Sequence, residues 1–202
     1  MQYIKWAVII VFWTVVVAFF HYTLPQRDIV RITDTNERRV DFGSNAFFYA
    51  QADAGADGTV PNRDVFFIQT VQANGRPMVY RNEDTAWGWP LYFKFDSANL
   101  QTEASDFRST SEAPKWVMIT HYGWRFELNS IYPNAIAIRA VSGPDASKGI
   151  PWVNGIILFI VAAVFWAIWV RWRRFREKRI DPQIEAMEDA IDERRARWFS
   201  RK

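Results

Sequence analysis

Three charged side chains stand just before two tryptophans and are the strongest candidates for chemistry in this sequence. They are Arg81, Glu83 and Asp84, followed by Trp87 and Trp89. Two neighbouring carboxyl groups can divide the roles of acid and base between them, and an exposed tryptophan ring is a common platform for sugars. The same pattern also fits a polar turn leading into a strand, with both tryptophans packed in the core. We favour this plainer interpretation.

A second short segment extends this candidate surface. Trp124 and Arg125 repeat the combination of an aromatic ring with a charged group. No catalytic residue is predicted, but if the chain binds a ligand we expect it at one surface. The candidate ligand-binding residues are Arg81, Glu83, Asp84, Trp87, Trp89, Trp124 and Arg125.

His121 is the remaining residue that could act as a general base or bind a metal ion. The only other histidine is His21, the chain has no cysteine, and no spacing typical of metal ligands occurs. We therefore predict no metal site and no cofactor, and we favour a structural histidine at a strand end. The sequence also lacks the serine and glycine motifs that would support hydrolase or nucleotide chemistry.

Two apolar segments are candidates for crossing a membrane. Residues 6–20 carry no charge but number only fifteen, so a spanning helix must recruit flanking residues to cross a core of about 30 Å. A cleaved signal peptide has an apolar region of similar length, but no small-residue cleavage site follows, and we favour an uncleaved anchor. Residues 150–170 form an uncharged run of twenty-one residues that is long enough by itself.

The distribution of charge predicts the orientation of both segments. Because basic residues are retained on the cytoplasmic side, we expect both termini in the cytoplasm and the central region in the periplasm. The central region carries thirteen basic and fifteen acidic residues, which argues against a nucleic-acid partner. The basic residues that follow the second segment, and that can also contact lipid head groups, are Arg171, Arg173, Arg174, Arg176, Lys178 and Arg179.

The central region has the pattern of a β-rich domain. One short helix is expected over residues 97–107, a hairpin turn at Asn74-Gly75, and a loop over residues 50–62. These elements fit a small barrel or sandwich, and among barrels they resemble the OB type. Strands are predicted over residues 28–33, 64–71, 77–81, 90–96, 115–121, 123–128 and 135–141.

The tail after the basic cluster is expected to be helical. Asp181-Pro182 is a good helix start, with a capping carboxylate before a proline. Ile184, Ile191 and Trp198 recur every seven residues and would give this helix a narrow apolar seam. The seam suits a protein partner or the membrane surface, and the alternative is a solvated tail.

Several stretches of the sequence resemble one bacterial family. They are Tyr80 to Pro90, Tyr92 to Gln101, Tyr122 to Arg125, Pro133 to Ala135, and Thr23 to Pro25. On these residues the chain resembles a proteobacterial family catalogued as domain of unknown function fifteen-twenty-three. The resemblance covers the first apolar segment and nearly all of the central region, and we least expect it in the tail. It implies an inner-membrane protein of a Gram-negative bacterium and supplies no reaction, cofactor or catalytic residue.

These observations predict a membrane-anchored α+β protein. Two transmembrane helices flank a mainly-β extracytoplasmic domain with one short helix, and a cytoplasmic amphipathic helix follows. The predicted segments are an N-terminal anchor over residues 1–21, a periplasmic domain over 22–149, a second transmembrane helix over 150–170, and a basic tail over 171–202.

The absence of recognisable chemistry favours a non-catalytic role. We expect an accessory, assembly or scaffolding protein of the inner membrane that contacts the lipid bilayer and a protein partner or a second copy of itself. A cell-envelope ligand-binding or sensing module that uses the aromatic surface is the alternative. A third class, an envelope enzyme, would need the charged candidates and His121 to converge in one cleft.

Overall fold

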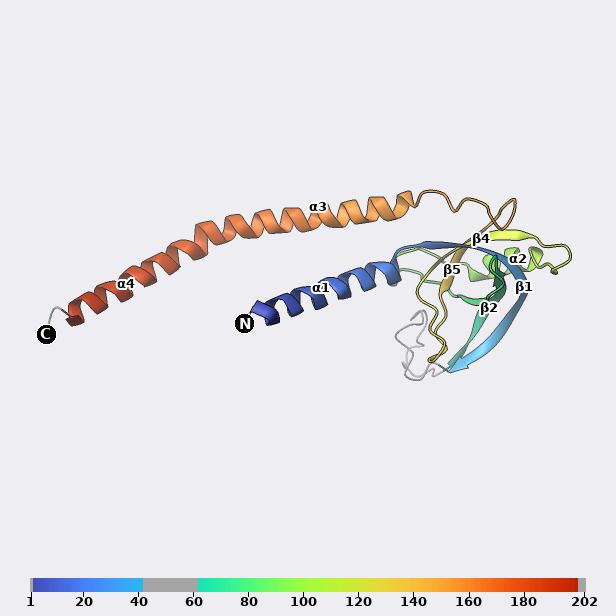
Figure 1. Ribbon diagram of the computed structural model, residues 1–202, viewed down its shortest axis with the longest axis horizontal. Helices are drawn as coiled ribbons and strands as arrows, with labels where there is room; N and C mark the ends of the chain where they lie inside the picture. Colours follow the sequence, from blue (N-terminus) through green and yellow to red (C-terminus); the bar gives the residue numbers. More distant parts are fainter. Residues whose placement is uncertain (1, 42–61, 200–202) are drawn as a thin grey trace. The chain divides into compact units, whose positions relative to one another are not determined.

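The computed structural model describes residues 2–41 and 62–199 and divides the chain into two compact units, Met1–Ile150 and Pro151–Lys202. The first unit holds an N-terminal helix, five strands and a short helix, and the second is helical (Figure 1). In chain order the elements are α1 (Gln2–Thr23), β1 (Gln26–Asp41), β2 (Asn62–Gln72), β3 (Pro77–Asn82), α2 (Ser97–Asp106), β4 (Trp116–Tyr122), β5 (Asn134–Ala140), α3 (Trp152–Phe175), a π-helical turn (Arg176–Ile180) and α4 (Asp181–Phe199).

The five strands close into a barrel in the order β1-β2-β3-β5-β4. Neighbouring strands are antiparallel except β3 and β5, which run parallel and meet at Arg81 and Asn134. β1 pairs with β4 near its start and with β2 further along, and its register shifts between Ile32 and Asp34. A five-stranded barrel with a helix between β3 and β4 is the arrangement of OB-type barrels. The β-domain is therefore a barrel and not a sandwich.

α2 covers one end of the barrel with apolar side chains. The Asp96 carboxylate caps its start by accepting a hydrogen bond from the backbone N–H of Asn99 at 3.0 Å. Leu100 and Ala104 lie four residues apart, so they share a helix face and both are buried. Together they pack in one core with Val30, Ile32, Ile68, Tyr80, Val117, Ile119, Ala135 and Ile138.

Two predicted strands are wrong. Residues 90–96 have no strand, because Phe93 takes a positive φ of +53° that interrupts the extended chain. Residues 123–128 also form no strand, apart from an isolated bridge between Phe126 and Ile131. Here Gly123, at φ +90°, turns the chain as soon as β4 ends.

The other predicted elements of this unit are confirmed where the structure describes them. β1 is longer than predicted and runs to Asp41. The hairpin between β2 and β3 forms, but of its two predicted turn residues only Gly75 has a positive φ, +81°. The loop predicted over residues 50–62 lies outside the described residues, except that Asn62 begins β2.

The second unit corrects the prediction of a separately capped tail helix. Asp181 has helical angles (φ −59°, ψ −43°), and the chain is already helical before it. A proline inside a helix cannot donate to the preceding turn, and its ring collides with the carbonyl four residues earlier. The wider π-turn directly before Asp181 and Pro182 accommodates this proline. Figure 1 shows the helix bending where α3 passes into α4.

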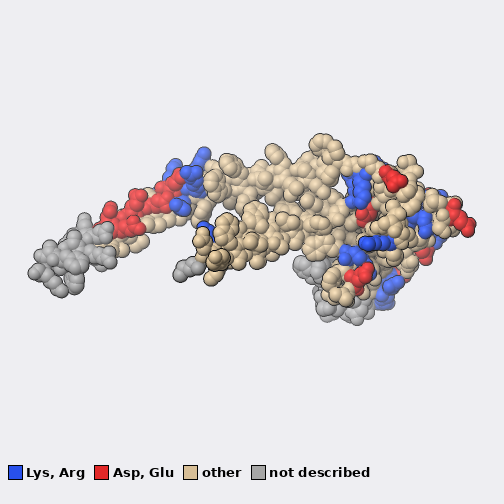
Figure 2. Space-filling model, in the orientation of Figure 1, with Lys and Arg blue, Asp and Glu red and all other residues tan. Residues whose placement is uncertain are grey.

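Two helices are long and apolar enough to cross a membrane: Gln2–Thr23, and the continuous helix that begins at Trp152. α1 has 22 residues because it includes the flanks of the apolar run. At 1.5 Å per residue its length is about 33 Å, enough for a hydrocarbon core of about 30 Å. Figure 2 shows both helices almost free of charged side chains up to the basic cluster that follows the second apolar run.

Candidate functional site

The loop over residues 83–96 ties the first unit's barrel to the end of α1. The Tyr92 hydroxyl donates a hydrogen bond to the backbone carbonyl of Thr23, the last residue of α1. The Trp89 ring stacks on Phe19, with 5.8 Å between the ring centroids. This loop therefore packs against one side of the final turn of α1, at the end of the barrel opposite α2 (Figure 1).

The loop over residues 123–133 makes a second attachment to the same helix end. The backbone N–H of Gly123 donates to the carbonyl of Tyr22 at 2.9 Å, and the indole N–H of Trp124 donates to Nδ1 of His21 at 2.8 Å. A Cβ at Gly123 would lie 3.6 Å from the Tyr22 ring, and its φ of +90° would be strained for any other residue. Because 3.6 Å is an ordinary van der Waals distance, the positive φ, and not a lack of space beside Tyr22, is what favours glycine here.

Beneath these loops lies a buried ion pair. Nη1 of Arg81 lies 3.2 Å from Oε2 of Glu83, and both side chains are almost completely buried. The side-chain oxygen of Asn134 accepts from the backbone N–H of Glu83 at 2.9 Å, and its amide donates to the Glu83 carbonyl at 3.1 Å. Tyr22 of α1 also hydrogen-bonds to Arg81. Because a buried charge that loses its partner is strongly destabilising, this pair has a structural role.

The side chain of Lys94 extends from the loop over residues 83–96 into the barrel, where it makes two hydrogen bonds. Its ammonium group donates to the carbonyl of Ala135 at 2.8 Å and to the side-chain oxygen of Asn82. Burial lowers the pKa of Lys94 to about 8, although the nearby carboxylates of Asp84 and Glu83 oppose the shift. The lysine therefore points into the protein and is held there by neutral acceptors.

A separate polar cluster joins β1, β3 and β4. The Asp28 carboxylate accepts from the Tyr80 hydroxyl at 2.8 Å, lies 3.0 Å from Nε2 of His121, and accepts from Lys148 at 3.2 Å. Burial alone would raise the pKa of Asp28, but the hydrogen bonds from His121 and Tyr80 and the positive charges outweigh it and hold the pKa well below its usual range. His121 is thus buried and bonded, as a structural histidine would be.

The structure divides the seven predicted ligand-binding residues into two groups. Arg81 and Glu83 are buried in their ion pair, while Asp84 is partly buried. Arg125 is partly buried too, with its guanidinium 4.4 Å from the centre of the Tyr132 ring. Trp87, Trp89 and Trp124 are 75%, 64% and 40% exposed, so the favoured interpretation that packs Trp87 and Trp89 in the core is wrong. Ligand binding at these residues stays a prediction.

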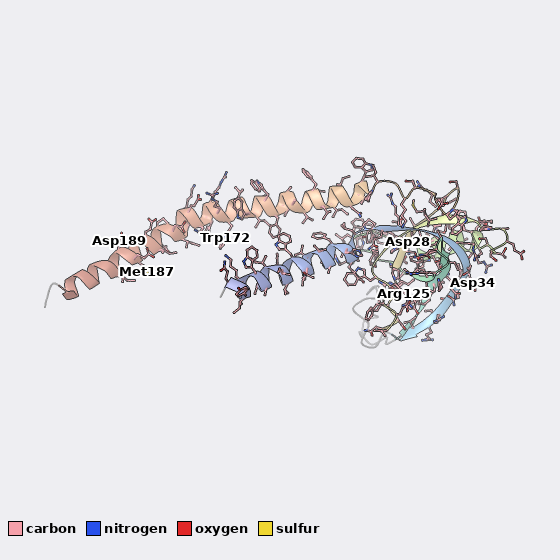
Figure 3. The ribbon with its side chains drawn as sticks, viewed as in Figure 1. Asp28, Asp34, Arg125, Trp172, Met187 and Asp189 are labelled. Carbon is pink, nitrogen blue, oxygen red and sulfur yellow. The ribbon has the colours of Figure 1, made fainter. Side chains whose placement is uncertain are left out.

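The exposed tryptophans belong to a larger apolar surface that sequence analysis does not identify. Alternation predicts Leu91, Phe93 and Phe95 as one face of a strand, but the structure places all three at the outer surface of a loop. Figure 3 labels Arg125, from the second loop, at the same α1-proximal end of the barrel as Asp28. We call the exposed apolar residues of the two loops the aromatic collar: Trp87, Trp89, Leu91, Phe93, Phe95, Trp124, Phe126 and Leu128.

The polar residues around Asp28 that support this end of the barrel have no local signal in the sequence. Asp28 and His121 are 93 residues apart, and Asp28 and Lys148 are 120 apart. No local pattern brings such residues together. The sequence does give one indication of the direction of Lys94. Lys94 alternates with Leu91, Phe93 and Phe95, so it must lie on the opposite side of the chain from them, and these three are exposed.

We predict that Asp28→Asn lowers the free energy of unfolding by about 2–3 kcal/mol, because three donors lose a charged acceptor. The stabilisation from a carboxyl with a lowered pKa is present above the ordinary value of 3.8 and is lost as the pH falls below it. Urea unfolding of the full chain in a neutral detergent, at pH 7 and at lower pH, measures both effects. Asp34→Asn, at an exposed ion pair with Arg108, is the matched control and should change little. An equal loss of unfolding free energy in the two variants would contradict a stabilising role for the Asp28 cluster.

We predict that Lys94→Met removes a rise in stability between pH 8 and 10. In that window the folded chain has released the Lys94 proton while the unfolded chain, with a pKa near 10.5, still holds it. The free energy of unfolding should therefore increase with pH, by at most about 1.4 kcal/mol per pH unit. Unfolding across this range measures the effect, and Lys115→Met, which replaces an exposed lysine, should keep the wild-type slope. An unchanged slope in Lys94→Met would refute the burial of that charge.

Comparison with known proteins places the chain in a family. A family model described as "Protein of unknown function (DUF1523)" matches residues 1–176 and so includes only the first six residues of the tail. A protein of Haemophilus influenzae named "Uncharacterized protein" is 36% identical over 168 residues, which cover 83% of this chain and 91% of that protein. No solved structure matches the chain. The match over most of the sequence, as the resemblance implied, shows that the chain belongs to the DUF1523 family.

Proposed function

We propose that this DUF1523 protein is a non-catalytic accessory or scaffolding protein of the bacterial inner membrane. In this proposal α1 and α3 cross the membrane, both termini lie in the cytoplasm, and the barrel lies in the periplasm. The barrel and α4 then offer surfaces on opposite sides of the membrane to protein partners or to a second copy of the chain.

The contacts at the end of α1 support an uncleaved anchor. Removal of the N-terminal segment after residue 20 would take away Phe19, the partner of Trp89, and would leave the hydrogen bonds at Tyr22 and Thr23 on an unanchored end. A signal peptide has no need of such contacts with the mature domain. The basic residues after α3 support the proposed orientation, because positive charge stays on the cytoplasmic side.

The bonding of the charged candidates supports a non-catalytic role. Arg81 and Glu83 pair with each other, whereas His121 belongs to the cluster around Asp28. Three of the groups that an envelope enzyme would use, Arg81, Glu83 and His121, are therefore in two different bonded sets. Each set satisfies structural contacts between strands of the barrel.

The observation that carries the scaffolding proposal is the apolar seam on α4. Ile184, Met187 and Ile191 are 45%, 62% and 56% exposed, on a helix whose other described residues are mostly charged. Their spacing of three and four residues places them on one face, as in helices that bind a groove or another helix. The side chain of Trp198, predicted for the same seam, lies outside those that the structure describes.

The exposed rings of Trp87, Trp89 and Trp124 favour a second candidate, the ligand-binding or sensing module. Flat aromatic surfaces that stay in contact with water are suited to sugars and other ring-shaped ligands. This candidate requires the three rings to remain accessible to water when the protein is in a bilayer.

The proposed topology predicts the labelling of two single cysteines in a chain that otherwise has none. Glu112→Cys lies in an exposed turn between α2 and β4, and Glu185→Cys lies on the exposed surface of α4. A maleimide that cannot cross membranes should label the first in intact spheroplasts and the second only after permeabilisation. Labelling of both, or the opposite order, would rule out this topology.

The scaffolding role predicts an assembly that depends on the α4 seam. After cross-linking in cells and purification of the full chain in a gentle detergent, we expect a homo-oligomer or a specific co-purifying protein. Ile184→Asp with Met187→Asp should weaken this association by about tenfold or more, because both side chains would become buried in the contact. Asp189→Ala, on the exposed face of α4 away from the seam, should keep it. A strictly monomeric wild-type chain without a partner would defeat the proposal.

A further inference from the structure

The depth of Trp89 relative to α1 is fixed by a direct contact. Trp89 stacks on Phe19, which belongs to the uncharged run of α1 and lies four residues before its end at Thr23. At 1.5 Å per residue, Phe19 is about 6 Å from the end of the helix. A residue that stacks on Phe19 must lie at the same level in any membrane that α1 crosses. The part of the barrel domain that carries Trp89 therefore lies at the level of the last turn of α1, within its apolar run.

In the loop that carries Trp89, the apolar side chains face outward and the polar side chains face inward. Leu91, Phe93 and Phe95 are each a little more than half exposed, while Tyr92 and Lys94 between them point inward and bond to α1 and the barrel. In a domain surrounded by water the alternation has the opposite sense, with apolar residues inside. Apolar residues outside and polar residues inside is the pattern of a surface in contact with lipid.

Charge is scarce on the exposed surface of this loop. Residues 86–93 contain no charged side chain, and the ammonium group of Lys94, which follows them, is directed inward. The second loop is amphipathic, because exposed Glu127 lies between Phe126 and Leu128. A tryptophan-rich apolar surface bordered by charges is typical of the boundary between lipid tails and head groups.

We propose that the aromatic collar is a membrane-docking surface that inserts into the outer leaflet of the membrane crossed by α1. The first loop enters to the level of Phe19, and the second loop, with Glu127, lies at the head groups. The occupant of this surface is the lipid interface itself, because the collar continues the apolar surface of α1 through the contacts of Phe19 with Trp89 and of Tyr22 with Trp124. The inference rests on the proposed membrane crossing of α1.

Spin labels can test this proposal, since the absence of cysteine allows one label per variant. Leu91→Cys and Leu128→Cys report on the two loops of the collar, and both positions are exposed, so the label should not disturb the fold. Val11→Cys in the middle of α1 is the reference for lipid, and Glu112→Cys near α2 is the reference for water. The full chain is placed in vesicles of phosphatidylethanolamine and phosphatidylglycerol, and the collision rates of each label with oxygen and with a water-soluble nickel chelate are measured.

We expect the ratio of oxygen to nickel collisions at both collar positions to exceed that at Glu112→Cys by roughly threefold or more, and to stay below that at Val11→Cys. Collar labels as accessible to nickel as the Glu112→Cys label would overturn the inference and leave the rings to a water-borne ligand or protein. If the Val11→Cys label is itself accessible to nickel, α1 does not cross the membrane, and the proposed function fails first. The two failures are therefore distinguishable.

Discussion

The attachment of α1 to the barrel is the interaction on which the rest of this structure depends. The helix brings its final turn to the open end of a barrel whose opposite end is covered by α2 (Figure 1). At the open end β3 and β5 run parallel and meet at a single residue pair, so the polar groups around Arg81 and Asn134 need partners from outside the sheet. Tyr22, Glu83, Lys94 and the two loops supply them. The N-terminal helix is thus part of the domain's fold as well as a candidate anchor.

The two ends of the barrel use different physical interactions. At the α2 end the contacts are apolar, and Leu100 and Ala104 complete a core of aliphatic side chains. At the α1 end an ion pair, an amide and a lysine lie under a layer of aromatic rings. Burying charge is costly unless every charge is paired, so this end tolerates little rearrangement. Such an end holds a helix in one position better than a purely apolar contact would.

The fold could be predicted from local patterns wherever one face of an element meets water and the other meets the core. A dense apolar run located β2, alternation located β5, and capping located α2. The same rule failed at residues 90–96, because alternation gives a period but does not say which face meets water, and because the positive φ of Phe93 leaves no trace in the sequence. The pair Asp181-Pro182 predicted a helix start but lies at a bend within a continuous helix, because a proline suits both positions. Of the candidate site, Trp87, Trp89 and Trp124 could be named in advance, but the exposure of Trp87 and Trp89 could not, because the sequence favoured packing both in the core. The bonds of Asp28 could not, because its partners lie far away in the chain.

The grip of the two loops on the last turn of α1 also has a mechanical consequence. A helix longer than the local hydrocarbon layer tilts to keep its apolar surface covered, and a thicker layer lets it stand upright. Because Tyr22 and Thr23 are bonded to the loops at 123 and 92, α1 cannot lean without turning the barrel by a similar angle. In a bilayer the tilt of α1 would therefore depend on membrane thickness, and the barrel would change its orientation together with the helix.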